Sequence, residues 1–170
     1  MAIRPATDND VPALARLVNS AYRGEFSKKG WTSEADLLVG GVRIDEEELL
    51  EMLHREKDAI LVEESAGEIR GCVHLVNKGE HVYLGLLTVN PLLQAGGIGK
   101  NLMTAAEAWT RQQQLKSIQL TVITARIELV AWYERRGYRD TGTRKPYPYR
   151  PATGEPSQPI VFMLMEKRLD

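Results

Sequence analysis

The sequence has only one cysteine, Cys72, among its 170 residues. A single thiol excludes an internal disulfide framework and any zinc site built from several cysteines. Cys72 also lies within an apolar run, which indicates a buried and unreactive thiol rather than a nucleophile. We therefore expect a domain without disulfides and without a bound metal.

Long apolar runs and an excess of one charge are also missing. No window is long and apolar enough to cross a bilayer, and Arg4 and Asp8 interrupt any apolar N-terminal run of the kind found in signal peptides. Lys plus Arg number 22 against 23 Asp plus Glu, so no general attraction to nucleic acid or membrane is expected. The sequence predicts a cytoplasmic protein with a single domain spanning residues 1–170.

Apolar periodicity predicts strands alternating with helices. Strands are expected at 2–6, 59–64, 69–76, 82–89 and 118–123, with one beginning at 138–142 and a last one at 160–166. Helices are expected after a cap at Thr7 or Asp8, at 32–38, after a cap at Asp45, from 98 to about 114, and at 126–136. The helix after Asp45 should bury Leu49, Leu50 and Leu53. Strands 59–64, 69–76 and 82–89 should form an antiparallel meander, whereas 82–89 and 118–123 should be parallel and joined by a right-handed crossover.

The stretch 86–100 carries the strongest functional signal. It is an apolar strand, a proline, and a turn in which three of the four residues 96–99 are glycine, followed by a helix. Glycines let the backbone approach a ligand closely, and the start of a helix presents unpaired N–H groups with a partial positive charge. This combination predicts an anion site, most often one for phosphate.

Three phosphate-binding motifs compete for this turn. A Walker loop requires glycine where the chain has Gln94, and serine or threonine where it has Asn101. A dinucleotide-binding turn requires a third glycine where the chain has Leu102. The third motif, Gln/Arg-x-x-Gly-x-Gly/Ala, is matched from Gln94 to Gly99.

With this motif the chain resembles the GNAT superfamily of N-acetyltransferases, in which the turn binds the pyrophosphate of acetyl-coenzyme A. A second segment, 131–138, is similar to the family's Ala-x-x-Tyr-x-x-x-Gly-Phe/Tyr pattern, with Tyr133 and Gly137 at the matching positions. The resemblance covers essentially the whole chain. It implies a mixed α/β fold, with a mostly antiparallel sheet of six to seven strands, a parallel pair that splays apart at the acetyl-coenzyme A site, and four to five flanking helices.

The resemblance also implies roles for individual residues. In the family, a bulge in the strand before the turn frees a backbone N–H for the acetyl oxygen, and Tyr133 corresponds to the proton donor for the coenzyme A thiolate. Arg126 stands where many relatives carry an asparagine that bonds the pantetheine arm, so it could contact the arm, a phosphate, or only a neighbouring acid. The expected cofactor contacts are Leu87, Thr88, Val89, Gln94, Ala95, Gly96, Gly97, Ile98, Gly99, Lys100 and Arg126.

The general base and the acceptor are less defined. Some relatives place a glutamate where this chain has Tyr83; Glu25, Glu34, Glu80 and His81 are the open alternatives. For the acceptor, the family uses segments that correspond here to 22–44 and 145–159. Expected substrate contacts are Tyr22, Trp31, Glu34 and Tyr147, with Tyr149 beside the last.

We therefore expect an acetyl-coenzyme A-dependent N-acetyltransferase that acts on a primary amine of a small or amino-acid-like acceptor, as a homodimer. The alternatives are a non-catalytic acyl-coenzyme A sensing module, a protein N-terminal or lysine acetyltransferase, and a structural domain with a vestigial turn.

Overall fold

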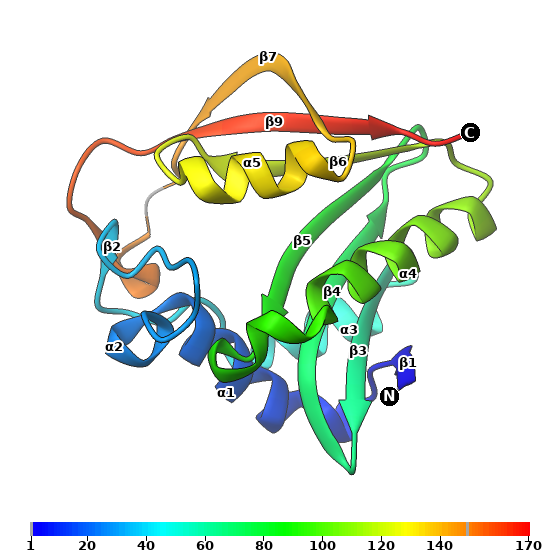
Figure 1. Cartoon of the computed structure of the whole chain (residues 1–170). Helices are drawn as coiled ribbons and strands as arrows, with labels where there is room; N and C mark the ends of the chain where they lie inside the picture. The colour runs from blue at the N-terminus through cyan, green and yellow to red at the C-terminus, as the bar shows by residue number, and fades with distance from the viewer. Residues whose placement is uncertain (1, 149) are drawn as a thin grey trace.

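The structure, a computed structural model, describes residues 2–148 and 150–170. One sheet has seven strands in the order β1-β3-β4-β5-β6-β9-β7, and a small second sheet pairs β2 with β8 (Figure 1). The strands are β1 (Ala2–Pro5), β2 (Leu38–Val39), β3 (Asp58–Ser65), β4 (Glu68–Asn77), β5 (Val82–Val89), β6 (Ser117–Ile123), β7 (Arg139–Pro146), β8 (Glu155–Pro156) and β9 (Val161–Arg168). The helices are α1 (Val11–Tyr22), α2 (Gly24–Ser27), α3 (Glu46–His54), α4 (Ile98–Gln112) and α5 (Ile127–Arg135), with the 3-10 turns η1 (Asp8–Asp10), η2 (Pro91–Gly96) and η3 (Pro151–Thr153). Tyr149 lies outside the described residues.

The predicted mixed α/β fold is confirmed. β3, β4 and β5 pair in antiparallel fashion through short turns, as the meander requires. β5 and β6, joined by the glycine turn and α4, form the parallel pair. Of the helices within the described residues, none is long and apolar enough to cross a membrane.

Two apolar clusters hold helices to opposite faces of the sheet. On one face, α4 and α5 pack over β4, β5, β6 and β9, with Leu102, Leu120 and Met165 fully buried. On the other, α1 and α3 pack over β3 and β4, with Leu14, Val18 and Leu49 at the centre. Each such side chain contributes roughly 1.5–3 kcal/mol by leaving water. α1 and α3 therefore cover only one half of their face, and the half formed by β6, β9 and β7 is left without a helix.

Two predictions are wrong, that of a helix at residues 32–38 and that of a buried Leu50 in α3. Residues 32–38 do not form a helix, because local side chains take over the backbone donors: the Ala35 N–H bonds the Ser33 hydroxyl at 3.0 Å. A single turn closed on the Glu34 carbonyl follows, and Leu38 then enters β2. Leu50 is also 36% exposed, because the face of α3 that packs on the core carries the buried Leu49 and, four residues on, the partly buried Leu53. The cap at Asp45 is confirmed, since its side chain accepts the Glu48 N–H at 2.8 Å.

β5 and β6 separate soon after they meet. Their pairing is confined to Val82 with Ile118 and Tyr83 with Gln119. Beyond this point the two halves of the sheet diverge, and Figure 1 shows β5 and β6 opening toward the side where β2 and α2 lie. The carboxyl half of β5 therefore faces a gap in the sheet rather than a neighbouring strand.

Candidate active site

A bulge in β5 marks the edge of this gap. Cys72 is opposite Thr88 and His74 is opposite Gly85, so β5 carries one residue more than β4 between these pairs. Leu86 lies in the bulge with φ +48, a left-handed conformation that costs a leucine about 1–2 kcal/mol. Its side chain is buried against α1, and its carbonyl accepts the Thr88 hydroxyl at 2.9 Å. These contacts offset the strain and turn the next residue, Leu87, toward the gap.

The first cavity lies between the end of β5, the glycine turn and α5. Its volume is about 400 Å³. Of the expected cofactor residues, it is lined by Leu87, Thr88, Val89, Gln94, Gly97, Gly99, Lys100 and Arg126. Gly96 lies beside this lining, Ile98 is 2% exposed in the core, and the side chain of Ala95 is not described.

The glycine turn fits a bulky anion. Gly97 has φ +78 and caps α4, so the first N–H groups of a 15-residue helix open beside the cavity. A Cβ on Gly96 or Gly97 would meet no atom within 4 Å, so this space is open for a ligand. A Cβ on Gly99 would instead lie 3.2 Å from the Trp132 ring, so this glycine is needed for packing of α4 on α5. Lys100 and Arg136 add positive charge to the same cavity.

The side chain of Gln94 fixes the turn to a distant segment. Its Oε1 accepts the Trp31 N–H at 2.7 Å, and Gly30 lies so close that a Cβ there would sit 2.3 Å from this oxygen. Trp31 and Thr32 line the first cavity beside the turn. Trp31, expected at the acceptor, therefore lines the cavity that holds most of the residues expected at the cofactor.

Tyr133 lies on α5 at the inner end of this cavity. It is 7% exposed and packs edge-on against Trp132 and Tyr138, with ring centroids 5.3 and 5.9 Å apart. Burial raises the pKa of its phenol above the usual value near 10, and Arg126 only partly opposes this. The hydroxyl is therefore neutral and available to donate at physiological pH.

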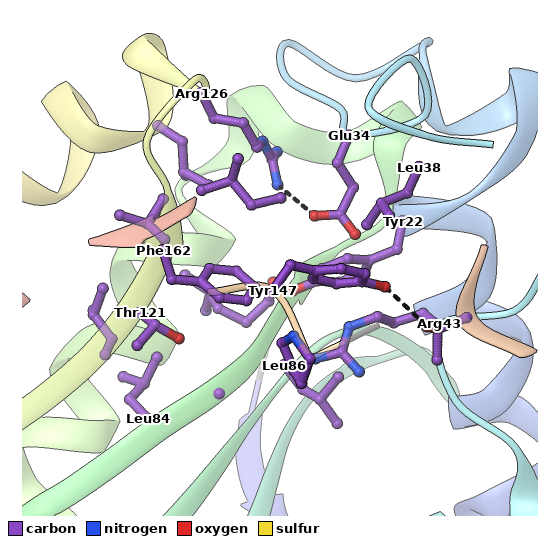
Figure 2. Close-up of a pocket in the computed structure, with 18 of the residues that line it drawn as sticks. Tyr22, Glu34, Leu38, Arg43, Leu84, Leu86, Thr121, Arg126, Tyr147 and Phe162 are labelled. Carbon is purple, nitrogen blue, oxygen red and sulfur yellow. Dashed lines mark hydrogen bonds and ion pairs between the residues drawn. The ribbon is translucent and has the colours of Figure 1, made fainter. Parts of the chain in front are cut away.

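A second cavity of about 220 Å³ lies on the other side of the gap (Figure 2). Four arginines line it, Arg23, Arg43, Arg126 and Arg150, against a single carboxylate, Glu34, among the described lining residues. Tyr147 and Phe162 form part of an aromatic wall, with ring centroids 6.0 Å apart. The two cavities share Tyr22, Leu87, Arg126, Leu129 and Tyr133.

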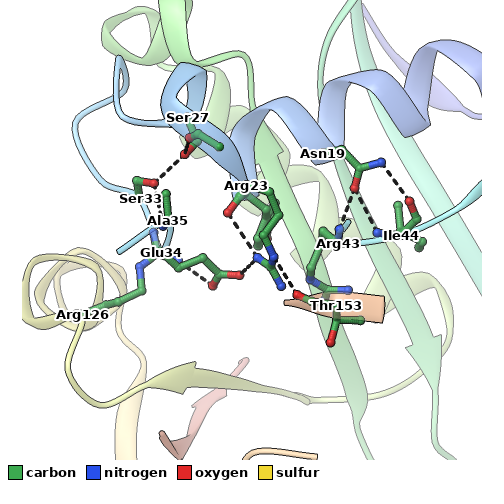
Figure 3. Close-up of polar contacts among 12 residues, drawn as sticks. Asn19, Arg23, Ser27, Ser33, Glu34, Ala35, Arg43, Ile44, Arg126 and Thr153 are labelled. Carbon is green, nitrogen blue, oxygen red and sulfur yellow. Dashed lines mark hydrogen bonds and ion pairs between the residues drawn. The ribbon is translucent and has the colours of Figure 1, made fainter. Parts of the chain in front are cut away.

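Glu34 is enclosed by two of these arginines. Its carboxylate accepts from Arg23 and, at 3.3 Å, from Arg126 Nη1 (Figure 3). Arg23 also donates to the Thr153 carbonyl at 2.8 Å, and Arg126 to the Thr32 hydroxyl at 3.0 Å. The buried Nε of Arg126 has no partner among the described residues. The carboxylate expected to hold a cationic amine is thus already neutralised, and the cluster as a whole is positive.

The residues considered for the general base are dispersed. Tyr83 reaches the second cavity, where its hydroxyl bonds that of Thr121 at 2.7 Å. The side chain of Glu25 is 89% exposed and pairs with Lys28 outside the cavity. Of the described residues, no three His, Cys, Asp or Glu side chains form a group that could hold a metal ion.

Sequence reasoning missed Arg23, Arg43, Arg150 and Arg136 as site residues. Arg23, Arg43 and Arg150 are far apart along the chain, and they meet at the second cavity only because the loops after α1, β2 and β7 converge. No pattern along the chain could have identified these three. Arg136 lines the first cavity and lies within the 131–138 segment, where its guanidinium is 3.8 Å from the centroid of the Trp132 ring.

The sheet splays beside a bulged strand, and a glycine turn opens a helix at the gap. These features point to one class of protein, the acetyltransferases. The family model described as an acetyltransferase (GNAT) domain matches residues 38–146. The chain belongs to this family, which supports an acyltransferase activity.

The comparisons with individual proteins agree with this assignment. An amino-acid acetyltransferase of Pseudomonas putida is 30% identical over 145 residues, which is 84% of this chain but 28% of that protein. The ribosomal-protein-alanine N-acetyltransferase of Brucella melitensis has a TM-score of 0.73 at 19% identity, covering 99% of this chain and 100% of the other. The structure of yncA from Salmonella typhimurium with its cofactor acetyl-CoA has a TM-score of 0.73 at 17% identity, covering 100% and 94%. At these identities the structural likeness is one of fold.

Proposed function

We propose that the chain is an acetyl-coenzyme A-dependent N-acetyltransferase that acetylates the primary amine of a small, amino-acid-like acceptor. The observation that carries this proposal is the meeting of two cavities at Leu87 and Tyr133. One cavity has the open glycine turn that suits a pyrophosphate, and the other is a polar chamber of a size for a small acceptor. Holding two reactants together at such a junction can supply roughly 7–11 kcal/mol of a barrier.

In this proposal the first cavity holds acetyl-coenzyme A as co-substrate. The helix start after Gly97, together with Lys100 and Arg136, binds the phosphates, and the β5 backbone from Leu87 to Val89 lies along the pantetheine arm. The bulge at Leu86 moves the Leu87 backbone out of the hydrogen-bond ladder between β4 and β5. The Leu87 N–H can then polarise the acetyl carbonyl by donating to its oxygen. Arg126, which lines both cavities, binds at their junction.

Tyr133 is proposed to donate its proton to the departing coenzyme A sulfur. The reference pKa values of a phenol and a thiol differ by an amount worth about 2 kcal/mol, and burial of Tyr133 widens this gap. The transfer therefore occurs late, when negative charge has formed on sulfur, with the hydrogen bond stabilising that charge beforehand.

The arginines of the second cavity suit an acceptor that carries a carboxylate beside its amine. A guanidinium pairs with a carboxylate through parallel hydrogen bonds, and like charge nearby lowers the pKa of an ammonium group. An alkyl ammonium with a pKa near 10.4 costs roughly 4–5 kcal/mol to deprotonate at pH 7. The same arginines would reduce this cost and bind the acid group.

Two measurements test the proposal. Saturating acetyl-coenzyme A should raise the melting temperature, and thiol release with a panel of amines should require an amine with a carboxylate. Stabilisation without thiol release would favour the non-catalytic sensing module. Turnover only with peptides or protein amines would favour a protein acetyltransferase.

The proposal retains three sequence-based expectations: one domain over residues 1–170, a cytoplasmic location and a homodimer. Limited proteolysis, cell fractionation and sedimentation equilibrium test them in turn.

A further inference from the structure

The second cavity, assigned above to the acceptor and called here the acceptor cavity, continues into a third cavity. This third cavity lies on the half of the sheet face that α1 and α3 leave uncovered. This groove, about 690 Å³ in volume, shares Arg43, Tyr83, Thr121, Pro148 and Phe162 with the acceptor cavity. Among the described residues, the groove shares no lining residue with the cofactor cavity. It therefore leads away from the acetyl-coenzyme A side, on the acceptor's side of the gap.

The groove has cationic sides and an apolar floor. The cations Arg43, Lys78 and Lys145 line it together with His81, and its described lining includes no aspartate or glutamate. Tyr83, Phe162 and Leu164 supply the apolar surface between them. A floor of this kind suits methylene groups, whereas the charged sides suit an anion.

Three cations of the groove, Arg43, Lys78 and Lys145, have no acid partner within the described residues. Arg43 stacks on the Tyr22 ring, with its guanidinium 5.3 Å from the ring centroid, and forms no ion pair. Lys78 and Lys145 are exposed and are absent from the salt bridges of the described chain. The nearby acid Glu166 is engaged by Ser117 at 2.6 Å and by Gln119 at 3.1 Å. Glu166 faces His81, so the charges that stay unpaired within the described residues are those of Arg43, Lys78 and Lys145.

We infer that the acceptor carries a second acid group, which this groove binds, and that the enzyme prefers dicarboxylic amines to their monocarboxylic analogues. This inference rests on the proposed function, because it assigns the second cavity to the acceptor. One carboxylate lies among Arg23, Arg126 and Arg43 near the amine. The methylenes follow the Tyr83 and Phe162 floor, and the second carboxylate lies between Lys78 and Lys145.

Binding of simple dicarboxylates tests the inference without requiring turnover. In low-salt buffer with saturating coenzyme A, dissociation constants are measured by calorimetry for succinate, glutarate and adipate and for their monoamides. The dicarboxylate of best-fitting length should bind about fivefold more tightly than its monoamide, as expected for a partly exposed ion pair. The double variant Lys78→Gln/Lys145→Gln should reduce this ratio to about unity.

Arg111→Gln is the matched control, because Arg111 is exposed at the end of α4 on the opposite face of the sheet. It removes one positive charge and should leave the ratio unchanged. Equal affinity of the wild type for acids and monoamides at every length would overturn the inference, as would an unchanged ratio in the double variant. Failure of thiol release with all amines would instead overturn the proposed function, because the binding measurement does not depend on it.

Discussion

Single residues of the site occupy positions that are unfavourable in isolation. Leu86 has a left-handed backbone, Tyr133 is a buried phenol, and Glu34 is a buried carboxylate between two guanidinium groups. Such features persist only where the surroundings over-determine them. All three line one cavity at the gap in the sheet, which is the arrangement that the proposed function requires.

Tyr133→Phe removes the proposed proton donor with little change in shape. We expect kcat to fall about 100-fold, with the dissociation constant for acetyl-coenzyme A nearly unchanged. Because burial keeps the Tyr133 pKa above its usual value, the wild-type rate should show no loss from phenol ionisation up to about pH 10. Thiol-release assays measure kcat, and equilibrium titration measures the dissociation constant for acetyl-coenzyme A.

Tyr138→Phe is the control for this change. Tyr138 is 1% exposed, packs against Tyr133, and its hydroxyl has no hydrogen-bond partner among the described residues. Removing that hydroxyl should leave kcat unchanged and stabilise the fold slightly. Equal losses of kcat in both variants would show that Tyr133 acts through packing alone.

Glu34→Ala leaves two buried guanidinium groups without their shared acid. The side chains of Arg23 and Glu34 are 5% and 8% exposed, so we expect the free energy of unfolding to fall by about 3 kcal/mol. Glu25→Ala, which breaks an exposed pair with Lys28, should cost less than about 0.5 kcal/mol. Urea unfolding of the two variants compares them, and similar losses would contradict the buried cluster.

Among the helices, strands and turns, the sequence predicted the ones with strong local signals. The helix after Asp45 and the turn at Gly97 follow from a cap and from a glycine whose left-handed φ other residues rarely adopt. Residues 32–38 were predicted wrongly, because the Ser33 hydroxyl takes the Ala35 N–H and because Glu34 contacts Arg126, which lies 92 residues away. Contacts at that range override the weak helical preference of a seven-residue segment.

The glycine turn is the element whose geometry is easiest to test. Gly97→Ala forces a Cβ into a left-handed conformation and should destabilise the protein by about 1 kcal/mol. It should also weaken acetyl-coenzyme A binding. Gly96→Ala has ordinary φ and open space around its Cβ, so its melting temperature should match the wild type. Equal melting temperatures for both variants would contradict the assigned conformation of Gly97.

The junction of β1 with η1 predicts how stability depends on pH. Arg4 donates to Asp10 at 2.8 Å and lowers the pKa of that carboxyl to about 2. A lowered folded-state pKa gives stability that is present above the unfolded value near 3.9 and is lost as pH falls toward about 2. Arg4→Gln should therefore reduce the loss of unfolding free energy between pH 5 and pH 2. An unchanged pH profile in urea titrations would contradict this pairing.

For the whole molecule, the residues expected at the cofactor come together in one cavity, whereas those expected at the acceptor do not. The turn residues and Tyr133 belong to two contiguous motifs, and most of them do line one cavity. The second cavity is lined by single arginines from separate parts of the chain, and Trp31 lines the first cavity instead. Convergence of distant segments has no local signature, so the positive acceptor cavity emerged only from the folded chain.

We propose that the two cavities form one reactive centre at the β5 bulge. Its most direct test is acetyl transfer, followed as thiol release from acetyl-coenzyme A together with the mass of the acceptor. We expect thiol release that depends on an amine, saturates with a carboxylate-bearing acceptor, and matches one acetyl group gained per thiol. Binding of acetyl-coenzyme A with no amine-dependent thiol release would contradict it.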